Sequence, residues 1–117
     1  MSRAPIFDSP SHPLLENIAV EFADWMAKHR GQGAHHGFQK RYDQIKEETG
    51  MGATEITAES WIWQEDCNQD ELWEEAVKCW KQSPGHWRVA NKVHKAVGSA
   101  MKKGRNGIWY FVAIVAD

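Results

Sequence analysis

The chain has 117 residues, a length typical of one domain and too short for a second core of similar size. Its composition, 42% hydrophobic and 26% charged, is that of a globular protein. The net charge is −2 and no Lys/Arg-rich block occurs, which argues against nucleic-acid binding. No stretch approaches the roughly 18 apolar residues of a membrane helix, so we expect no transmembrane segment.

The N-terminal third is predicted to be an arm followed by two helices. Residues 1–12 contain two prolines and little periodicity, which indicates an extended arm. Apolar residues at three-to-four spacing predict a first helix from near Pro13 to His29. A second helix, about His36 to Glu48, should end at Thr49-Gly50, where glycine supplies a left-handed C-cap.

The middle of the chain is predicted to form a strand and two further helices. Apolar and polar residues alternate from Ala53 to Trp63, which indicates a strand. Asn68, with Glu71 three residues later, is typical of a helix start. Ser83-Pro84 should end that helix and open a short one over about 85–93.

The C-terminal segment is predicted to be a hairpin. It comprises a strand over 97–102, a turn through 103–107 and a nearly continuous apolar strand over 108–116. A strand that is apolar on both faces should be central and covered on both sides. The predicted fold class is α+β: an α-β-α sandwich with a small, about three-stranded antiparallel sheet between helices. Residues 13–117 form this domain, preceded by the arm.

Tryptophan and cysteine are the two residue types that composition singles out. Seven tryptophans fit a Trp-rich core better than a ligand-lining role, although both remain open. Cys67 and Cys79 are too few for a disulfide framework and lack a metal-binding spacing, so either two free thiols or one bridge is possible. No apolar leader follows Met1, which leaves the compartment open: cytoplasmic, or secreted or periplasmic if a leader has been removed.

Three ordered segments resemble the C-terminal half of a known domain. They are AVKCWKQSPGHW at 76–87, VGSA at 97–100 and GIWYFV at 107–112. Upstream, HHGF at 35–38 with Arg41, and AES at 58–60, extend the likeness. In this order they resemble the CAP superfamily of cysteine-rich secretory proteins, antigen 5 and pathogenesis-related proteins. The resemblance spans about 13–117 and implies a bacterial-type member shortened at its N-terminus.

The resemblance also implies a site. CAP domains commonly hold two histidines and two glutamates around a cleft that can bind a divalent metal. Three counterparts are His35, Glu59 and His86, while the fourth position falls on Ser83. Two imidazoles and a carboxylate are suitable Zn²⁺ ligands. Glu55 is the alternative to Glu59.

Residues of this predicted site also have interpretations that involve no ligand. His86 can be a structural histidine hydrogen-bonded to backbone, and Glu59 can be a surface residue. His36 is expected to face solvent. The expected cleft residues are His35, Glu59, Trp61, His86 and Trp87.

The function predicted first is a binding domain, whose cleft holds a divalent metal such as zinc and a small or lipid-like ligand. The alternatives are a zinc-dependent hydrolase using the same cleft, or a structural or interaction domain with a vestigial cleft that contacts another protein. Enzymatic activity is the less favoured alternative, because no general base and no G-x-S-x-G motif can be identified. The sequence leaves the oligomeric state open.

Overall fold

The apolar C-terminal run forms the central strand of a three-stranded antiparallel sheet with the order β1-β3-β2. The computed structural model describes residues 4–29, 33, 35–61 and 68–117. The elements are, in chain order, the 3-10 helix η1 (Pro5–Asp8), α1 (Pro13–Lys28), α2 (Phe38–Thr49), β1 (Ala53–Trp61), α3 (Gln69–Lys81), α4 (Pro84–Ala90), β2 (Ala96–Lys103) and β3 (Ile108–Ala116).

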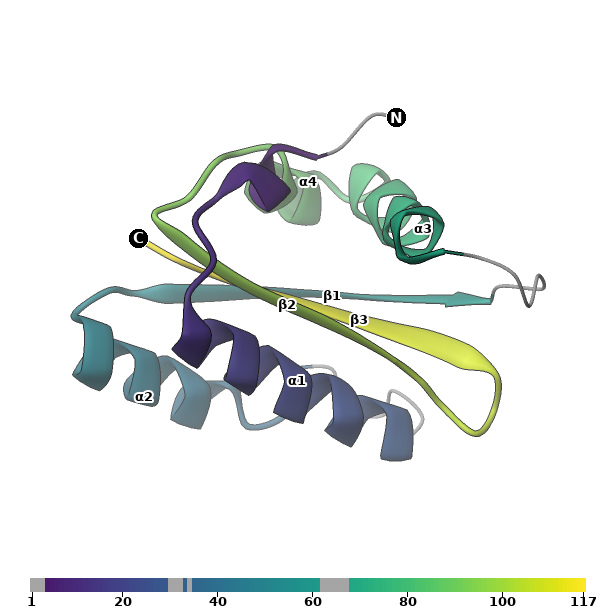
Figure 1. Cartoon of the computed structure of the whole chain (residues 1–117), viewed down its shortest axis with the longest axis horizontal. Coiled ribbons are helices and arrows are strands. Elements are labelled where there is room, and N and C mark those ends of the chain that lie inside the picture. The colour runs from purple at the N-terminus through teal and green to yellow at the C-terminus, as the bar shows by residue number, and fades with distance from the viewer. Residues whose placement is uncertain (1–3, 30–32, 34, 62–67) are drawn as a thin grey trace.

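Helices lie on both faces of this sheet. Helices α1 and α2 cover one face, and α3, α4 and η1 cover the other (Figure 1). The predicted α+β fold with helices on both sides of a small antiparallel sheet is therefore confirmed. No helix in the described part of the chain is long and apolar enough to cross a membrane.

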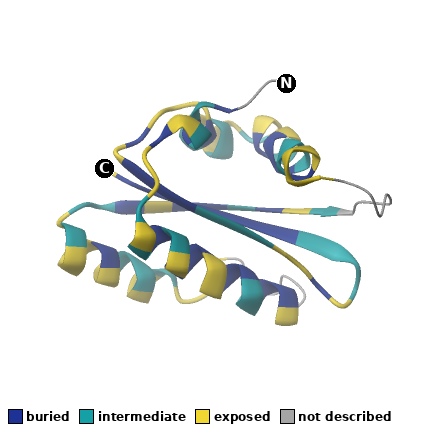
Figure 2. Ribbon diagram, in the orientation of Figure 1, coloured by how far each residue is buried: buried dark blue, intermediate teal, exposed yellow. Residues whose placement is uncertain are grey.

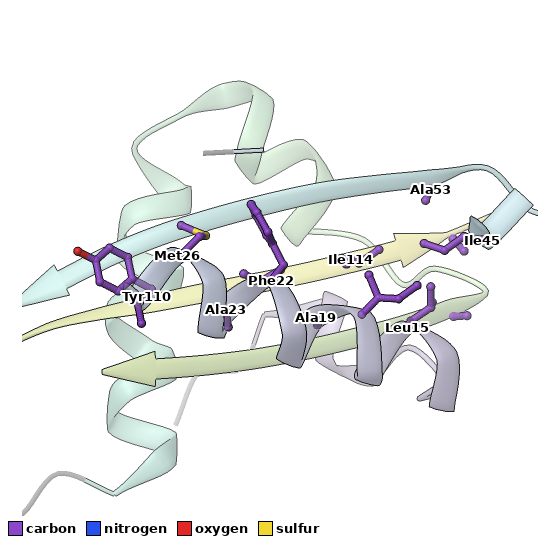
Figure 3. Close-up of a cluster of buried hydrophobic side chains, with 14 residues drawn as sticks. Leu15, Ala19, Phe22, Ala23, Met26, Ile45, Ala53, Tyr110 and Ile114 are labelled. Atoms are coloured by element: carbon purple, nitrogen blue, oxygen red, sulfur yellow. The ribbon is translucent and has the colours of Figure 1, made fainter. Parts of the chain in front are cut away.

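Alternate side chains of β3 enter two separate hydrophobic cores. Tyr110, Val112 and Ile114 pack under α1, in the cluster that Figure 3 shows. Phe111 and Val115 pack on the opposite face, in the core that includes residues of η1, α3 and α4. All five are at most 1% exposed, and the buried colour runs along much of β3 in Figure 2. The predicted central position of this strand is confirmed.

Helix α1 is anchored to the sheet by its apolar stripe and by an unusually close approach to β2. Its buried stripe includes Leu15, Phe22 and Met26, and burying such side chains contributes roughly 1.5–3 kcal/mol each. At its N-terminus, Nδ1 of His12 accepts a hydrogen bond from the Leu14 amide at 3.1 Å. A Cβ atom added to Gly98 would lie 2.1 Å from the Leu15 carbonyl carbon, so only glycine permits this helix-strand distance.

A buried histidine connects α4 with the end of β3. His94 Nε2 lies 2.8 Å from the Val89 carbonyl and Nδ1 lies 2.7 Å from Asp117 Oδ2. The two ring nitrogens thus lie against two different acceptors, one on α4 and one at the end of the chain. Burial raises the pKa of Asp117, but hydrogen bonds from His94 and the Lys95 amide, with the charges of His94 and Lys92, outweigh it and lower that pKa overall.

The observed elements differ from the predicted ones in three places. The arm is not simply extended, since it contains η1 and bridges β2 at Ser11 and Val97. Helix α4 ends at Ala90 instead of about 93, and His94 beyond it is held by the side chains of Ser9 and Asp117. Ser83 makes no side-chain capping bond, whereas Asn68 accepts the Glu71 amide as predicted. The last two residues of the predicted strand, at 62 and 63, lie outside the described residues.

We predict that Gly98→Ala destabilises the domain by about 3 kcal/mol, since the new methyl group collides with the α1 backbone. Gly85→Ala is the matched control: a Cβ at Gly85 meets nothing within 4 Å, and alanine favours a helix. Urea unfolding of both variants measures the difference. Equal stability of the two proteins would show that α1 and β2 are not this close.

A second prediction concerns pH. A lowered carboxyl pKa stabilises the folded state above the unfolded value of 3.8, and this contribution is lost as pH falls through the folded pKa. Asp117→Asn should therefore cost about 1 kcal/mol at pH 7, because the Asp117 side chain is 46% exposed and partly screened. Near pH 3 the difference from the parent should shrink. A difference independent of pH in urea titrations would contradict the ion pair.

Candidate functional site

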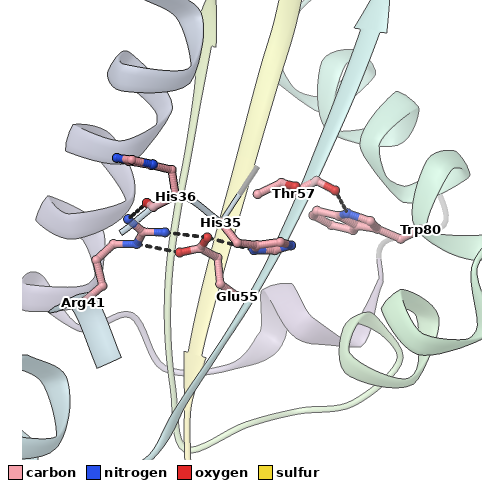
Figure 4. Close-up of polar contacts among 6 residues, drawn as sticks. All are labelled: His35, His36, Arg41, Glu55, Thr57 and Trp80. Carbon is pink, nitrogen blue, oxygen red and sulfur yellow. Dashed lines mark hydrogen bonds and ion pairs between the residues drawn. The ribbon is translucent and has the colours of Figure 1, made fainter. Parts of the chain in front are cut away.

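A buried ion pair joins α2 to the sheet. The Glu55 side chain on β1 is 1% exposed, and Arg41 on α2 contacts it with two nitrogens. Arg41 Nε lies 2.7 Å from Oε2 and Nη2 lies 2.8 Å from Oε1, a two-point geometry that suits a guanidinium and a carboxylate (Figure 4). The Arg41 Cζ atom also lies 3.6 Å from the centre of the Phe22 ring on α1. Arg41 therefore ties together α1, α2 and β1.

The same ion pair holds the loop that precedes α2. Arg41 Nη1 donates to the His36 carbonyl at 2.6 Å, and His35 Nδ1 lies 3.0 Å from Glu55 Oε1. A carboxylate only accepts, so His35 donates from Nδ1. His35 has φ of 65°, a left-handed conformation that is uncommon outside glycine. The contact with Glu55 ties the His35 side chain to β1.

Next to this loop, three aromatic rings are stacked on the outside of α1. Trp25 is stacked with His29 at 4.0 Å between ring centres and with His36 at 4.6 Å. The His29 ring is further fixed by a 2.7 Å contact between its Nδ1 and the Trp25 carbonyl. His36 is exposed, as the sequence predicted, yet its ring is held in place by Trp25.

A groove of about 540 Å³ runs between α1 and α2 beside this stack. That volume is within the range of small-molecule sites. Its apolar lining comes from α1, and the His36-Gly37 segment and α2 supply the other wall. The lining residues are Ile18, Glu21, Phe22, Trp25, His36, Gly37, Lys40, Arg41 and Gln44.

Some polar groups that line the groove are already paired, and others have no partner among the described residues. The charge of Arg41 is balanced by Glu55, so it is not free for a ligand. The side chains of Glu21, Lys40 and Gln44 make no hydrogen bond or ion pair with any described residue. The groove thus combines an aromatic lining with three polar groups that are available to a ligand.

The structure does not gather the predicted metal ligands. His35 contacts Glu55 rather than Glu59, and Glu59 is exposed near the end of β1. His86 lies on α4, in the helical layer on the other side of the sheet from α2 (Figure 1). Among the residues that the structure describes, no three His, Cys, Asp or Glu side chains form a group that could hold a metal ion. The structure therefore does not bring His35, Glu59 and His86 together into one group.

Trp87, one of the two predicted cleft tryptophans, is not part of the lining of the α1-α2 groove. Trp87 on α4 is half-buried, with Lys81 Nζ 5.4 Å from its ring centre. The side chain of Trp61, the last residue of β1, lies outside the described residues. Of the predicted site residues whose side chains the structure describes, only His35 adjoins a lining residue of the groove, its neighbour His36.

Cys79 is a free, half-buried thiol on α3. Its Sγ donates to the Glu59 carbonyl at 3.5 Å. Burial raises the pKa of Cys79, and the carboxylates of Glu75 and Glu59 raise it further. A thiol that is kept protonated in this way is a poor nucleophile.

The sequence patterns did not predict that Arg41, Glu55 and Trp25 belong to one connected site. Arg41 and Glu55 are 14 residues apart on different elements, and no local spacing joins them. No local signal marks Glu55, because it alternates with apolar residues in the same way as the other polar residues of β1. The helical spacing places Trp25 in the buried stripe of the first helix, whereas it is only half-buried.

Comparisons with known proteins support the fold but no family. No family model and no curated protein matches the chain. A similar solved structure is that of an outer surface protein from Borrelia burgdorferi, with a TM-score of 0.67 and 18% sequence identity, covering 93% of this chain and 77% of that one. A likeness at this identity shows a shared fold and nothing further.

The resemblance to the CAP superfamily is accordingly wrong, because no family model supports it. The residues that suggested it have structural roles here. Trp80 donates from Nε1 to the Thr57 carbonyl, Pro84 begins α4, and Gly98 permits the approach of α1. Short motifs of this kind reflect the packing of the domain.

We predict that Glu55→Gln destabilises the domain by about 3 kcal/mol, because it leaves the largely buried Arg41 cation without its partner. Glu59→Gln is the matched control on the same strand, and its exposed side chain should change stability by less than about 0.5 kcal/mol. Urea unfolding at neutral pH measures both. Similar losses in the two variants would contradict the assignment of Glu55 as the buried partner.

Proposed function

We propose that the protein is a binding module whose groove between α1 and α2 takes a small amphipathic ligand. The observation that carries this proposal is the pairing of an aromatic lining, Phe22 and Trp25, with polar side chains that have no partner among the described residues. Binding sites for small molecules typically combine an apolar surface with a few polar groups that fix orientation.

The groove is held in shape before any ligand binds. Arg41 is fixed by Glu55 and by the His36 carbonyl, and His36 is stacked on Trp25. One wall is therefore tied to the sheet through a buried ion pair. A preformed wall lowers the entropic cost of binding, which supports a binding role.

The charges of the rim indicate the kind of ligand. Lys40 lies on α2 without an ion-pair partner among the described residues, and Gln44 lies one turn further along the same helix. An anionic or hydrogen-bonding group of the ligand would contact these two residues, while its apolar part would cover Phe22 and Trp25. A small organic acid with an aromatic or aliphatic body has this character.

Catalysis is less well supported by the same residues. Glu55, the buried carboxylate nearest the groove, is engaged by Arg41 and His35 and has no free role as a base. The Cys79 thiol lies on α3, across the sheet from the groove (Figure 1). We therefore favour binding over turnover.

The proposal is tested with 8-anilinonaphthalene-1-sulfonate, a dye with an aromatic body and one anionic group. We expect saturable binding by the folded protein, about tenfold weaker for Trp25→Ala and about fivefold weaker for Lys40→Glu. The loss reflects removal of the apolar contact in one variant and of the cation in the other. Dye fluorescence and calorimetry measure both affinities.

Lys78→Glu is the control for Lys40→Glu. Lys78 is an exposed lysine on α3, on the other face of the sheet, and it makes only a surface ion pair with Glu75. Thermal melting of each variant shows whether it is folded. If Lys40→Glu and Lys78→Glu proteins bind the dye equally well, the groove is not the binding site.

A further inference from the structure

The sheet has two outer edges, and α3 covers part of the β1 edge. Two β1 carbonyl groups that point away from β3 accept hydrogen bonds from α3 side chains. Thr57 accepts from Trp80 Nε1 at 3.0 Å, which Figure 4 shows, and Glu59 accepts from Cys79 Sγ at 3.5 Å. These acceptors are therefore not available to another chain.

Among the described residues, the opposite edge of the sheet, β2, is paired only at its beginning. The Val97 amide donates to the Pro10 carbonyl at 2.8 Å, and the Val97 carbonyl accepts from the His12 amide at 3.0 Å. The N-terminal arm thus forms one parallel bridge with this edge, at Ser11. It then turns into α1, which passes along one face of the sheet (Figure 1). The chain itself shows that the edge accepts an added extended segment.

Beyond Val97 the β2 edge is open. Backbone groups alternate in direction along a strand, so those of Ser99, Met101 and Lys103 point the same way as those of Val97. Within residues 4–29, 33, 35–61 and 68–117, no further backbone group bonds to these three from outside the sheet. The open edge is about 13 Å long at roughly 3.3 Å per residue, enough for a partner strand of about five residues.

Positive charge is concentrated at the far end of this edge. Lys102, Lys103 and Arg105 are all exposed, and none forms an ion pair with a described carboxylate. The pKa of Asp24 is lowered mainly by its hydrogen bond with Lys28 and only weakly by the charge of Lys102. Asp24 is already paired with Lys28. Lys102, Lys103 and Arg105 therefore have no carboxylate partner among the described residues.

The charges distinguish between two possible occupants. Two copies paired edge to edge about Met101 would place Lys102 of each chain within about 8 Å of the other, inside the screening length at physiological salt. Lysines on edge strands are known to oppose such self-association. An acidic segment would meet the same cations favourably.

We propose that the open edge of β2, from Ser99 to Lys103, binds an extended acidic segment of a partner protein by strand addition. The partner's backbone bonds to the outward amides and carbonyls of Ser99, Met101 and Lys103 and supplies most of the affinity. Its carboxylates lie against Lys102, Lys103 and Arg105 and select acidic sequences. This site is separate from the groove between α1 and α2.

The probe is a synthetic octapeptide of alternating valine and glutamate, titrated into the ¹⁵N-labelled protein. The amide resonances of Ser99, Met101 and Lys103 should shift more than those of β1. Binding should weaken when salt rises from about 0.05 M to about 0.5 M, because the charges become screened. The same peptide with N-methyl groups on every residue should not bind, since neither of its edges keeps a backbone donor for strand pairing.

Two sets of variants test the charge contacts and the backbone pairing separately. Lys102→Glu with Lys103→Glu should weaken binding about tenfold through lost attraction, and Lys78→Glu should leave it unchanged. Met101→Pro removes one outward donor at an edge position where proline is tolerated, and it should weaken binding at least about fivefold. Thermal melting confirms that each variant is folded.

Three outcomes would overturn the proposal. The first is equal binding of the N-methylated peptide, which would exclude strand addition. The second is equal binding by the double lysine variant, which would exclude selection of acidic segments. The third is association of the protein with itself through β2 in the absence of peptide, seen by ultracentrifugation, which would assign the edge to a second copy of the chain.

Discussion

The burial of β3 on both faces is the constraint on which the rest of the structure depends. Its side chains alternate between a core under α1 and a core under α3, so neither helical layer can be removed without exposing half of the strand. With β3 in the centre, β1 and β2 become the edges of the sheet. The two edges differ in their contacts: α3 side chains bond to β1, while the described part of the N-terminal arm bonds to β2 only at Val97. The asymmetry between the edges thus follows from the central strand.

The same constraint explains the buried ion pair. The first half of β1 lies between β3 and α2, and a carboxylate at Glu55 is taken out of water there. A buried charge without a partner is strongly destabilising, so Arg41 is required in a fixed geometry. Arg41 then holds the loop before α2 through the His36 carbonyl, and His36 is stacked on Trp25. The buried charge of Glu55 thus determines the shape of the groove, through Arg41 and His36.

Elements were predictable from the sequence where a local pattern decides the structure. The apolar run over 108–116 predicted a central strand, and Asn68 and Gly50 marked helix ends that the structure confirms. The site was not predictable, because its contacts join residues far apart in sequence. Of the two glutamates expected near His35, the preferred Glu59 is not its partner; the position of α2 brings Glu55, the alternative, to it. The resemblance to the CAP superfamily did not supply these long-range contacts. The residues that match its motifs are those that the packing of β1, β2 and α4 requires.

The groove and the β2 edge differ in what they can recognise. The groove presents side chains, so its selectivity depends on the shape of the aromatic surface and on Lys40. The open edge presents backbone, so any extended segment can bond to it and only the charges near its end select among them. Each surface lies beside a part of the fold that is already fixed: the groove beside the Arg41 ion pair, and the edge beside the Gly98 contact with α1. Because these anchors are on different strands, occupation of one surface need not alter the other, and the two can be tested by independent substitutions in the same protein.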